Sequence, residues 1–403
     1  MGRGKTWTAA LALAVAVGLP AGAWAGNDTD DDIIVGFATG KSGILQAYDQ
    51  PAEHAAKIRI EEINAAGGLL GKQIQIVDSD TKSDRNEGVK AGQAVVDEGA
   101  DIVVVTCDYD YGAPAAGVAQ DEGLISFFLC AEDVKAGIEG IGPYSFSASV
   151  LAAVQGATMA EWAYNKRDVK TGYVLVDTSV EYSKSVCYGF EWMFPKVGGK
   201  IVGKDGFQNA DPSIASQITR IKSLPEVPDA IMLCTYNPGG ASAVKQLRAA
   251  GIDSLILNGS SLDGSYWLAA VPGLSDFVVP VQGSIYGDDP DPKVEAFNKK
   301  FEAKYGARPG SQYAYPGYVL IDVWAKAVER AGTTETEAVV AELEKMREEP
   351  TLFGPRTFTD KLHHQNITTY KIVEATDGKF GYVDEWTISE PVPMEILFGG
   401  VQN

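Results

Sequence analysis

The sequence predicts an α/β protein of two doubly wound parallel-sheet lobes separated by a cleft. The chain has 403 residues, about two to three times the usual size of one domain. Apolar strands alternate with amphipathic helices through short connections, as in parallel sheets that carry helices on both faces. This alternation restarts after "GIGPYSFSAS" at residues 140–149. The restart divides the chain into two α/β units.

The first unit is predicted as four strands with three helices between them. Residues 48–68 show the reasoning, because their apolar side chains recur at helical spacing and two glycines follow. The predicted strands are 33–38, 72–80, 101–106 and 124–129, and the predicted helices are 48–68, 84–99 and 112–123.

The second unit repeats the pattern. Asp211 is predicted as the N-cap of its third helix, with Pro212 at the first helical position. The predicted helices are 151–165, 181–194, 211–223 and 239–251, and the predicted strands are 171–177, 200–207, 229–235 and 254–259. Two amphipathic helices, 293–306 and 318–332, precede a hairpin at 368–388 that turns at Asp377-Gly378.

Residues 1–25 are typical of a cleavable signal peptide. Arg3 and Lys5 precede a short apolar run, and residues 23–25 form a small-x-small cleavage site. The run is too short to cross a bilayer, and no cysteine follows the cleavage site to carry a lipid anchor. The mature protein is therefore expected to be a soluble monomer in the periplasm.

The acidic balance of the chain argues against nucleic-acid binding. The net charge of −20 becomes −22 when Arg3 and Lys5 are removed with the signal. Such a chain repels phosphate backbones and anionic membranes, and it remains soluble.

Four cysteines leave two interpretations open. In an oxidising compartment, Cys107 could pair with Cys130 and Cys187 with Cys234, within each half of the chain. The alternative is that all four are free buried thiols. No CxxC spacing occurs, so a zinc site is not expected.

The motifs of catalysis and of nucleotide binding are missing from the sequence. It contains no GxSxG elbow, HExxH helix, GxGxxG turn or phosphate-binding loop, so no catalytic residue and no cofactor are expected. The only adjacent histidines, His363 and His364, are predicted to form a solvated turn rather than a metal site. An enzyme would have to use Cys130, the one candidate for a reactive group in the cleft.

Ligands of open α/β sheets bind beyond the carboxyl ends of the strands. Two such ends carry cysteine followed by carboxylates, at Cys107-Asp108 and at residues 130–133. Glu132 in the cleft would repel a carboxylate and favour a cation or a hydrogen-bond donor. The alternative is that Glu132 and Asp133 point outward and cap the next helix. Aromatic side chains on the cleft-facing turns add contact area; they are Phe37, Tyr48, Tyr109, Tyr111, Tyr182, Tyr236 and Trp267.

A family resemblance runs through nearly all of the mature chain. The segments that carry it are "INAAGGLLGKQIQIVDSDTKSD", "AVVDEGADIVVV", "DEGLISFF", "EYSKS", "NADPSIASQITRIKS", "NPGGASAVKQLRAAG" and "SQYAYPGYVLIDVWAKAVERAG". In order and spacing they resemble the periplasmic branched-chain and hydrophobic amino-acid receptors of ABC transporters, which have the type I periplasmic-binding-protein fold.

The resemblance implies a three-segment hinge, with the chain passing between lobes near residues 147, 284 and 360. Lobe 1 would then comprise residues 26–147 and 285–360, and lobe 2 residues 148–284 and 361–403.

The resemblance also implies positions for the ligand. Amino-acid receptors bind the ligand carboxylate with a Ser after the third strand and a Thr after the fourth. These positions fall here near Tyr109 and at residues 130–132, and the acidic partner of the ammonium falls near Ser261, with Asp263 close by. The expected ligand-binding residues are Phe37, Tyr48, Asp108, Tyr109, Cys130, Ala131, Glu132, Tyr182, Tyr236, Ser261 and Asp263.

The function expected from these features is capture of a small ligand by hinge closure, without chemistry. The candidates are a branched-chain or other amino acid and a related amide, aromatic compound or amine. The partners would be the membrane permease and ATPase subunits of an ABC importer. The alternative is a ligand sensor of the same fold that feeds a signalling receptor.

Overall fold

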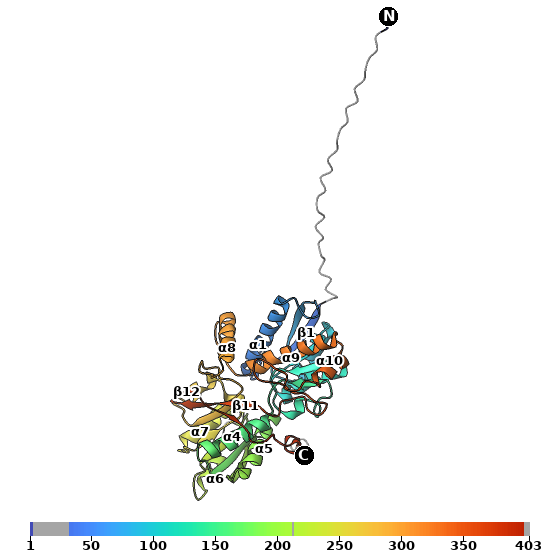
Figure 1. Cartoon of the computed structure of the whole chain (residues 1–403). Coiled ribbons are helices and arrows are strands. Elements are labelled where there is room, and N and C mark those ends of the chain that lie inside the picture. Colours follow the sequence, from blue (N-terminus) through green and yellow to red (C-terminus); the bar gives the residue numbers. More distant parts are fainter. Residues whose placement is uncertain (3–31, 212, 399–403) are drawn as a thin grey trace. The chain divides into compact units, whose positions relative to one another are not determined.

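The fold is described from a computed structural model that covers residues 1–2, 32–211 and 213–398. Residues 3–25 of the predicted signal peptide and Pro212 lie outside the described residues. Two sheets with helices on both faces make up residues 32–398, which confirms the predicted α/β class (Figure 1). Within the described ranges, no helix combines the length and the apolar character needed to cross a bilayer.

The first sheet has five parallel strands in the order β2-β1-β3-β4-β5. Their bounds are β1 Ile33–Thr39, β2 Ile74–Asp80, β3 Ile102–Val105, β4 Ile125–Phe128 and β5 Ser145–Ser147. The order reverses direction between β1 and β3, which creates a switch point at their carboxyl ends. β5 lies in the segment that the sequence predicts as a connection, because three residues are too few to show strand alternation.

Helices cover both faces of this sheet because side chains alternate along each strand. On β3, Ile102 and Val104 pack in the core shared with α1 and α9, whereas Val103 and Val105 pack with α2 and α3. These elements form the first lobe. Its helices are α1 Gln46–Ala65, α2 Arg85–Asp97, α3 Tyr109–Asp121, α8 Pro292–Tyr305, α9 Ala314–Ala331 and α10 Thr336–Leu343, with the short turn η2 Val134–Ala136.

The second sheet has seven strands in the order β12-β11-β10-β9-β8-β6-β7. Its bounds are β6 Thr171–Asp177, β7 Lys200–Phe207, β8 Ala230–Cys234, β9 Leu255–Leu257, β10 Phe277–Val281, β11 Thr369–Thr376 and β12 Lys379–Thr387. Strands β6 to β10 are parallel and repeat the order of the first sheet, with the switch point between β6 and β8. β11 and β12 form the antiparallel hairpin predicted around Asp377-Gly378.

The helices of this second lobe also cover both faces. Val174 and Met232 pack with α4 and α5, whereas Leu175 and Ile231 pack with α6 and α7. The bounds are α4 Ala152–Lys166, α5 Glu181–Lys196, α6 Ala215–Lys222, α7 Gly239–Ala249 and α11 Met394–Leu397, with the turns η3 Ser260–Leu262 and η4 Ser265–Ala270.

The predicted start of α6 is wrong. The helix begins at Ala215 with Ile214 as its N-cap, and the Asp211 carboxylate accepts a hydrogen bond from the Ser213 amide at 3.0 Å. Asp211 therefore stabilises a turn before the helix, an alternative that aspartate side chains commonly offer the backbone.

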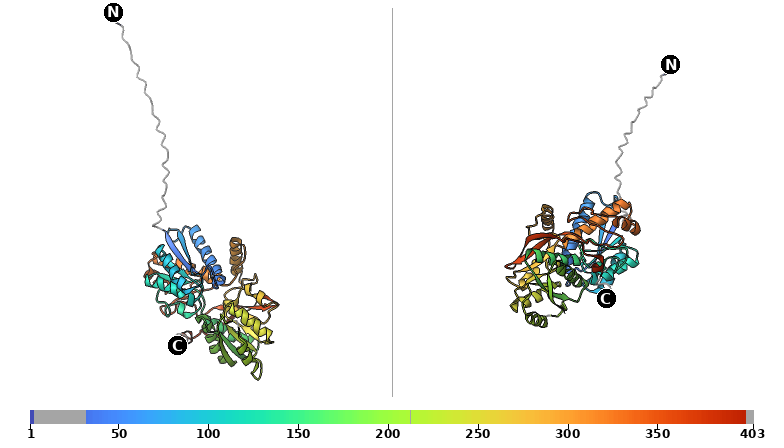
Figure 2. Two further views of the ribbon diagram at one scale, coloured as in Figure 1. Left: turned by 180° about the vertical axis from the view of Figure 1, so that it is seen from behind. Right: turned by 60° about the horizontal axis from the view of Figure 1, so that its bottom comes forward.

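The chain crosses between the sheets after β5, after β10 and after α10. The first and third crossings run side by side, because the Leu151 amide donates to the Gln365 carbonyl at 2.9 Å and the Gln365 amide to the Ser149 carbonyl at 3.2 Å. The orange helices α9 and α10 consequently lie with the blue and cyan first sheet. The red strands β11 and β12 lie with the green and yellow second sheet (Figure 1; Figure 2).

Candidate functional site

A cavity lies where the carboxyl ends of both sheets face each other, next to their switch points. The space left between its side chains is small, about 30 Å³, which is room for roughly two water molecules. The first lobe and the loop before α9 contribute Leu45, Tyr48, Cys107, Asp108, Glu132 and Tyr313, and the second lobe contributes Tyr182, Tyr236 and Ser261.

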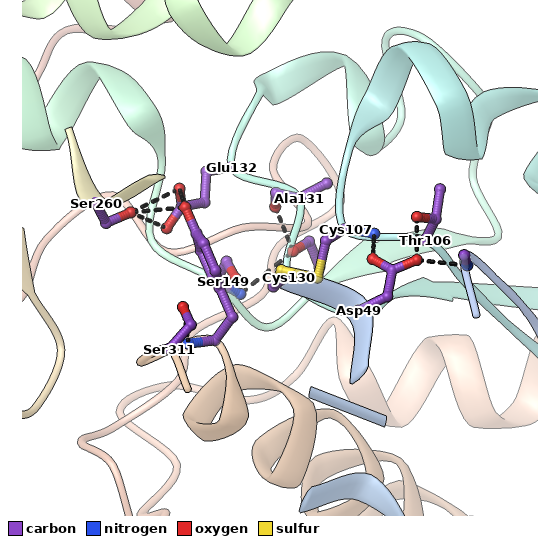
Figure 3. The surroundings of a disulfide bond; sticks show 12 residues. Asp49, Thr106, Cys107, Cys130, Ala131, Glu132, Ser149, Ser260 and Ser311 are labelled. Carbon is purple, nitrogen blue, oxygen red and sulfur yellow. Dashed lines mark hydrogen bonds between the residues drawn. A yellow bond between two sulfur atoms is a disulfide. The ribbon is translucent and has the colours of Figure 1, made fainter. Parts of the chain in front are cut away.

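Asp49 fixes the turns on the first-lobe side. Its carboxylate accepts hydrogen bonds from the Gly40 amide at 2.6 Å, the Cys107 amide at 2.8 Å and the Thr106 hydroxyl (Figure 3). The end of β1, the end of β3 and the first turn of α1 are thereby held to one buried group. Asp49 thus fixes the backbone at the position where Cys107 and Asp108 enter the cavity wall.

Both predicted disulfides form, so the alternative of four free thiols is wrong. Cys107–Cys130 joins the ends of β3 and β4 beside the cavity (Figure 3). Cys187–Cys234 joins α5 to the end of β8, with the two Cα atoms 5.8 Å apart. It holds the helix that carries Tyr182 to the strand that leads to Tyr236. Because Cys130 is in a disulfide, the one thiol considered for an enzyme is not a free thiol.

The two carboxylates after β4 have different roles. Glu132 faces the cavity, where it accepts a hydrogen bond from the Ser260 hydroxyl at 3.0 Å (Figure 3). It accepts a second hydrogen bond from the Tyr313 hydroxyl at 2.9 Å. Asp133 caps η2 by accepting from the Lys135 amide at 2.9 Å, and it also accepts from the Ser185 hydroxyl. Asp133 is therefore a helix cap, as one alternative predicted, but it is buried rather than pointing outward, and Glu132 lines the cavity.

Burial sets the protonation of the acidic groups in the cavity wall. Loss of water raises the pKa of Glu132 to about 8, although hydrogen bonds oppose the shift. Burial, together with the charge of Asp110, raises the pKa of Asp108 well above its ordinary value. Asp108 is also the N-cap of α3 and accepts from the Tyr111 amide at 3.2 Å. None of the residues that line the cavity is a lysine, arginine or histidine.

Hydrogen bonds and an ion pair join the two lobes around the cavity. The Asn237 amide donates to the Tyr48 hydroxyl at 3.0 Å, and Lys135 pairs with Glu181 at 2.9 Å. The Glu181 amide of the second lobe also donates to the Asp110 carboxylate of the first lobe at 2.8 Å. These contacts describe a state in which the lobes touch.

Six of the predicted ligand-binding residues line the cavity: Tyr48, Asp108, Glu132, Tyr182, Tyr236 and Ser261. The other five do not. The side chain of Phe37 points into the core on the α1 face of its strand, and Ala131 packs against the opposite core. Tyr109 is the first residue of α3 and packs against its core from outside, and Cys130 is covered behind the disulfide.

Asp263 turns away from the cavity to the loop before α9. Its carboxylate accepts from the Ser311 hydroxyl at 2.8 Å and the Gln312 amide at 2.5 Å. The predicted solvated turn at His363 and His364 is also wrong, because both side chains are buried and His363 Nδ1 lies 2.8 Å from the Ser145 carbonyl oxygen. Trp267 packs in the second-lobe core against Phe277 rather than at the site.

Three lining residues were not among the predicted ligand-binding residues: Leu45, Cys107 and Tyr313. Of these, Cys107 was predicted only as a strand-end cysteine that could form a disulfide. Tyr313 follows β10 by about thirty residues and reaches the cavity only because the chain crosses back to the first lobe. Its segment, "SQYAYPGYV", carries part of the family resemblance, and this resemblance is the signal from which Tyr313 could have been predicted as a site residue. Leu45 precedes α1 as an apolar residue in a polar turn.

The protein is expected to lose stability as pH rises from about 5 to about 8. Burial raises the pKa of Asp49 and Asp263 to about 7, of Glu132 to about 8 and of Asp133 to about 6. Above the unfolded value of about 4, the folded state holds more protons than the unfolded chain, so rising pH favours unfolding. Scanning calorimetry should show the midpoint falling by several degrees across this range.

Glu132→Gln should reduce this slope, because it removes the group with the highest of the four pKa values. Lys361→Gln changes an exposed charge and serves as the control. A midpoint that rises with pH over the same range would contradict the assignment.

Comparisons with known proteins place the chain among binding proteins. The family model described as "Periplasmic binding protein" matches residues 32–379. The "Leu/Ile/Val-binding protein homolog 3" of Brucella melitensis is 24% identical over 376 residues, covering 92% of this chain and 96% of that protein.

Two solved structures show the same fold. The branched-chain amino acid transporter substrate binding protein of Streptococcus pneumoniae, in complex with isoleucine, gives a TM-score of 0.77 at 24% identity, covering 89% of this chain and 99% of that one. A solute binding protein of an ABC transporter from Rhodopseudomonas palustris, in complex with 3,4-dihydroxy benzoic acid, gives a TM-score of 0.72 at 20% identity. The match covers 89% of this chain and 98% of that one.

Proposed function

Because the chain belongs to the periplasmic binding protein family, whose members are substrate-binding proteins, we propose that it is the periplasmic receptor of an ABC importer. The observation that carries this proposal is a cavity lined from both lobes at the carboxyl ends of their strands. A site of this kind is completed only when the lobes meet, so ligand and closure are thermodynamically linked.

The proposed lobes are residues 26–147 with 285–360, and 148–284 with 361–403, joined by three hinge segments. The ligand is a small molecule with an apolar part that contacts the tyrosine rings, within a range that includes the isoleucine and aromatic acid bound by similar proteins. The closed form then docks on a membrane permease that is driven by an ATPase. The proposed ligand-binding residues are Tyr48, Asp108, Glu132, Tyr182, Tyr236, Ser261 and Tyr313.

Small-angle scattering and thermal unfolding against a metabolite panel test this function. The panel contains amino acids, aromatic acids, amides and amines, each added to freshly refolded protein that has lost any copurified ligand. At least one compound should reduce the radius of gyration and raise the unfolding midpoint. Absence of both responses for every compound would refute a receptor role.

A further inference from the structure

We propose that the ligand is a small organic cation, an amine that is protonated at neutral pH and carries no carboxylate. This inference rests on the proposed function and names the chemical class of its ligand. It draws on two independent features of the cavity wall, the sign of its charged groups and its aromatic rings.

The ionisable groups of the cavity wall include two acids and no base. Asp108 and Glu132 both line the cavity, and no cationic side chain lines it with them. The nearby Lys135 is engaged with Glu181. A carboxylate ligand would find no positive group in this site, whereas an ammonium could pair with Glu132 in its ionised form.

Among the described residues, the strongest interactions of these two carboxyls involve no cation either, and Arg85 pairs with Asp110, a neighbour of Asp108. Glu132 is surrounded by Ser260, Gln155, Tyr182, Tyr313, Tyr370 and Asp263. Asp108 is surrounded by Asp110, Asp133, Tyr48, Tyr111 and Tyr236. No described basic side chain forms an ion pair with Glu132, so a bound ammonium would be the counterion of its ionised form.

Tyrosine rings form much of the remaining wall. Tyr48, Tyr182, Tyr236 and Tyr313 all line the cavity, and the rings of Tyr48 and Tyr313 meet edge to face with centroids 5.8 Å apart. Aromatic rings attract cations through their negative faces, and such walls recur in sites for organic ammonium ions. They offer no comparable attraction to a carboxylate.

The test compares ligands of one shape that differ only in charge. Calorimetric titration at about pH 8 uses 3-methylbutylammonium, 3-methylbutanol, 3-methylbutanoate and leucine, and a second series uses benzylammonium, benzyl alcohol and benzoate. In at least one series the amine should bind at least about ten times more tightly than the alcohol and the acid. Amines that bind no better than the acids in both series, or that do not bind at all, overturn the inference.

Two isosteric variants locate the interaction. Glu132→Gln should weaken amine binding about ten-fold or more and leave alcohol binding nearly unchanged, and Asp108→Asn, which preserves the helix cap, should act in the same direction. The matched control is Asp133→Asn, because Asp133 is an equally buried neighbour that does not line the cavity. Equal losses for all three variants would indicate a purely structural effect and overturn the inference.

The pH dependence separates this inference from the receptor role itself. Burial raises the pKa of Glu132 to about 8, so a bound amine should release protons and bind more tightly at about pH 8 than at about pH 6. A carboxylate ligand should show the opposite trend. If an acid or an amino acid closes the protein and binds better at low pH, the receptor function stands and the cation inference fails.

Discussion

Replacing Gly156 by alanine is expected to lower the free energy of unfolding by about 3 kcal/mol or more. Gly156 lies in α4 where this helix crosses α5, and a Cβ atom there would lie 1.8 Å from the carbonyl oxygen of Val186. The obstacle is backbone rather than a flexible side chain. The two helices would have to separate, which would open the core between them.

The close approach of α4 and α5 involves a glycine on each helix, which strengthens the expected loss of stability. A Cβ on Gly189 of α5 would lie 1.8 Å from the carbonyl oxygen of Ala153 in α4. Gly189→Ala should therefore cost a similar amount. Because α5 also carries Tyr182 and Cys187, its displacement should weaken ligand binding in addition to stability.

Gly117→Ala is the matched control. Gly117 lies within α3, and a Cβ atom at this position would meet nothing within 4 Å. Alanine has the higher helix propensity, so this variant should gain up to about 1 kcal/mol. Urea unfolding of the three variants measures the difference, and equal stabilities for Gly156→Ala and Gly117→Ala would refute the close crossing.

The elements that could be predicted from sequence are those with a strong period or a strong stop signal. The strands 171–177 and 200–207 have the same bounds in sequence and structure, because apolar runs end there at polar turns. Asp108 and Glu132 could be predicted as cavity residues for a related reason. The carboxyl ends of neighbouring parallel strands reach the same edge of a sheet.

The features that could not be predicted depend on contacts between segments that lie far apart in the sequence. A local sequence pattern carries no information about such contacts. Glu132 is satisfied by Tyr313, 181 residues further along the chain, and by Ser260, 128 residues away. His363 appeared to be a turn residue, yet its ring stacks on Phe146 with centroids 3.7 Å apart. The polar sequence around His363 predicts an exposed side chain. His363 is buried instead, because the chain crosses between the sheets at this point.

Arg356 provides the second large expected effect, at the place where the three crossings of the chain meet. Its side chain is buried, and Nε donates to the Ala148 carbonyl at 2.7 Å while Nη2 donates to the Gln282 side chain at 2.9 Å. Nη1 donates to the carbonyl of Phe353 at 3.1 Å. One guanidinium therefore joins the segments after β5, after β10 and before β11.

The charge of Arg356 is held by neutral oxygens alone, since no described carboxylate forms an ion pair with it. Burial lowers the pKa of Arg356 to about 10, so the side chain stays protonated at neutral pH. Carbonyl oxygens left without their donor in a buried site cost about 1–3 kcal/mol each. The planar, five-donor geometry is what allows one side chain to serve several of them.

Arg356→Met is therefore expected to lower the free energy of unfolding by about 3 kcal/mol, because methionine fills the volume but donates no hydrogen bond. Arg356→Lys should recover little, since one ammonium cannot span the acceptors on separate segments. Arg330→Met removes a half-exposed arginine that pairs with Glu349 and should cost less than about 1 kcal/mol. Denaturant unfolding of the three variants distinguishes these outcomes. If Arg356→Lys proved as stable as the wild type, charge alone would suffice and Arg356 would not act as a geometric tie between the crossings.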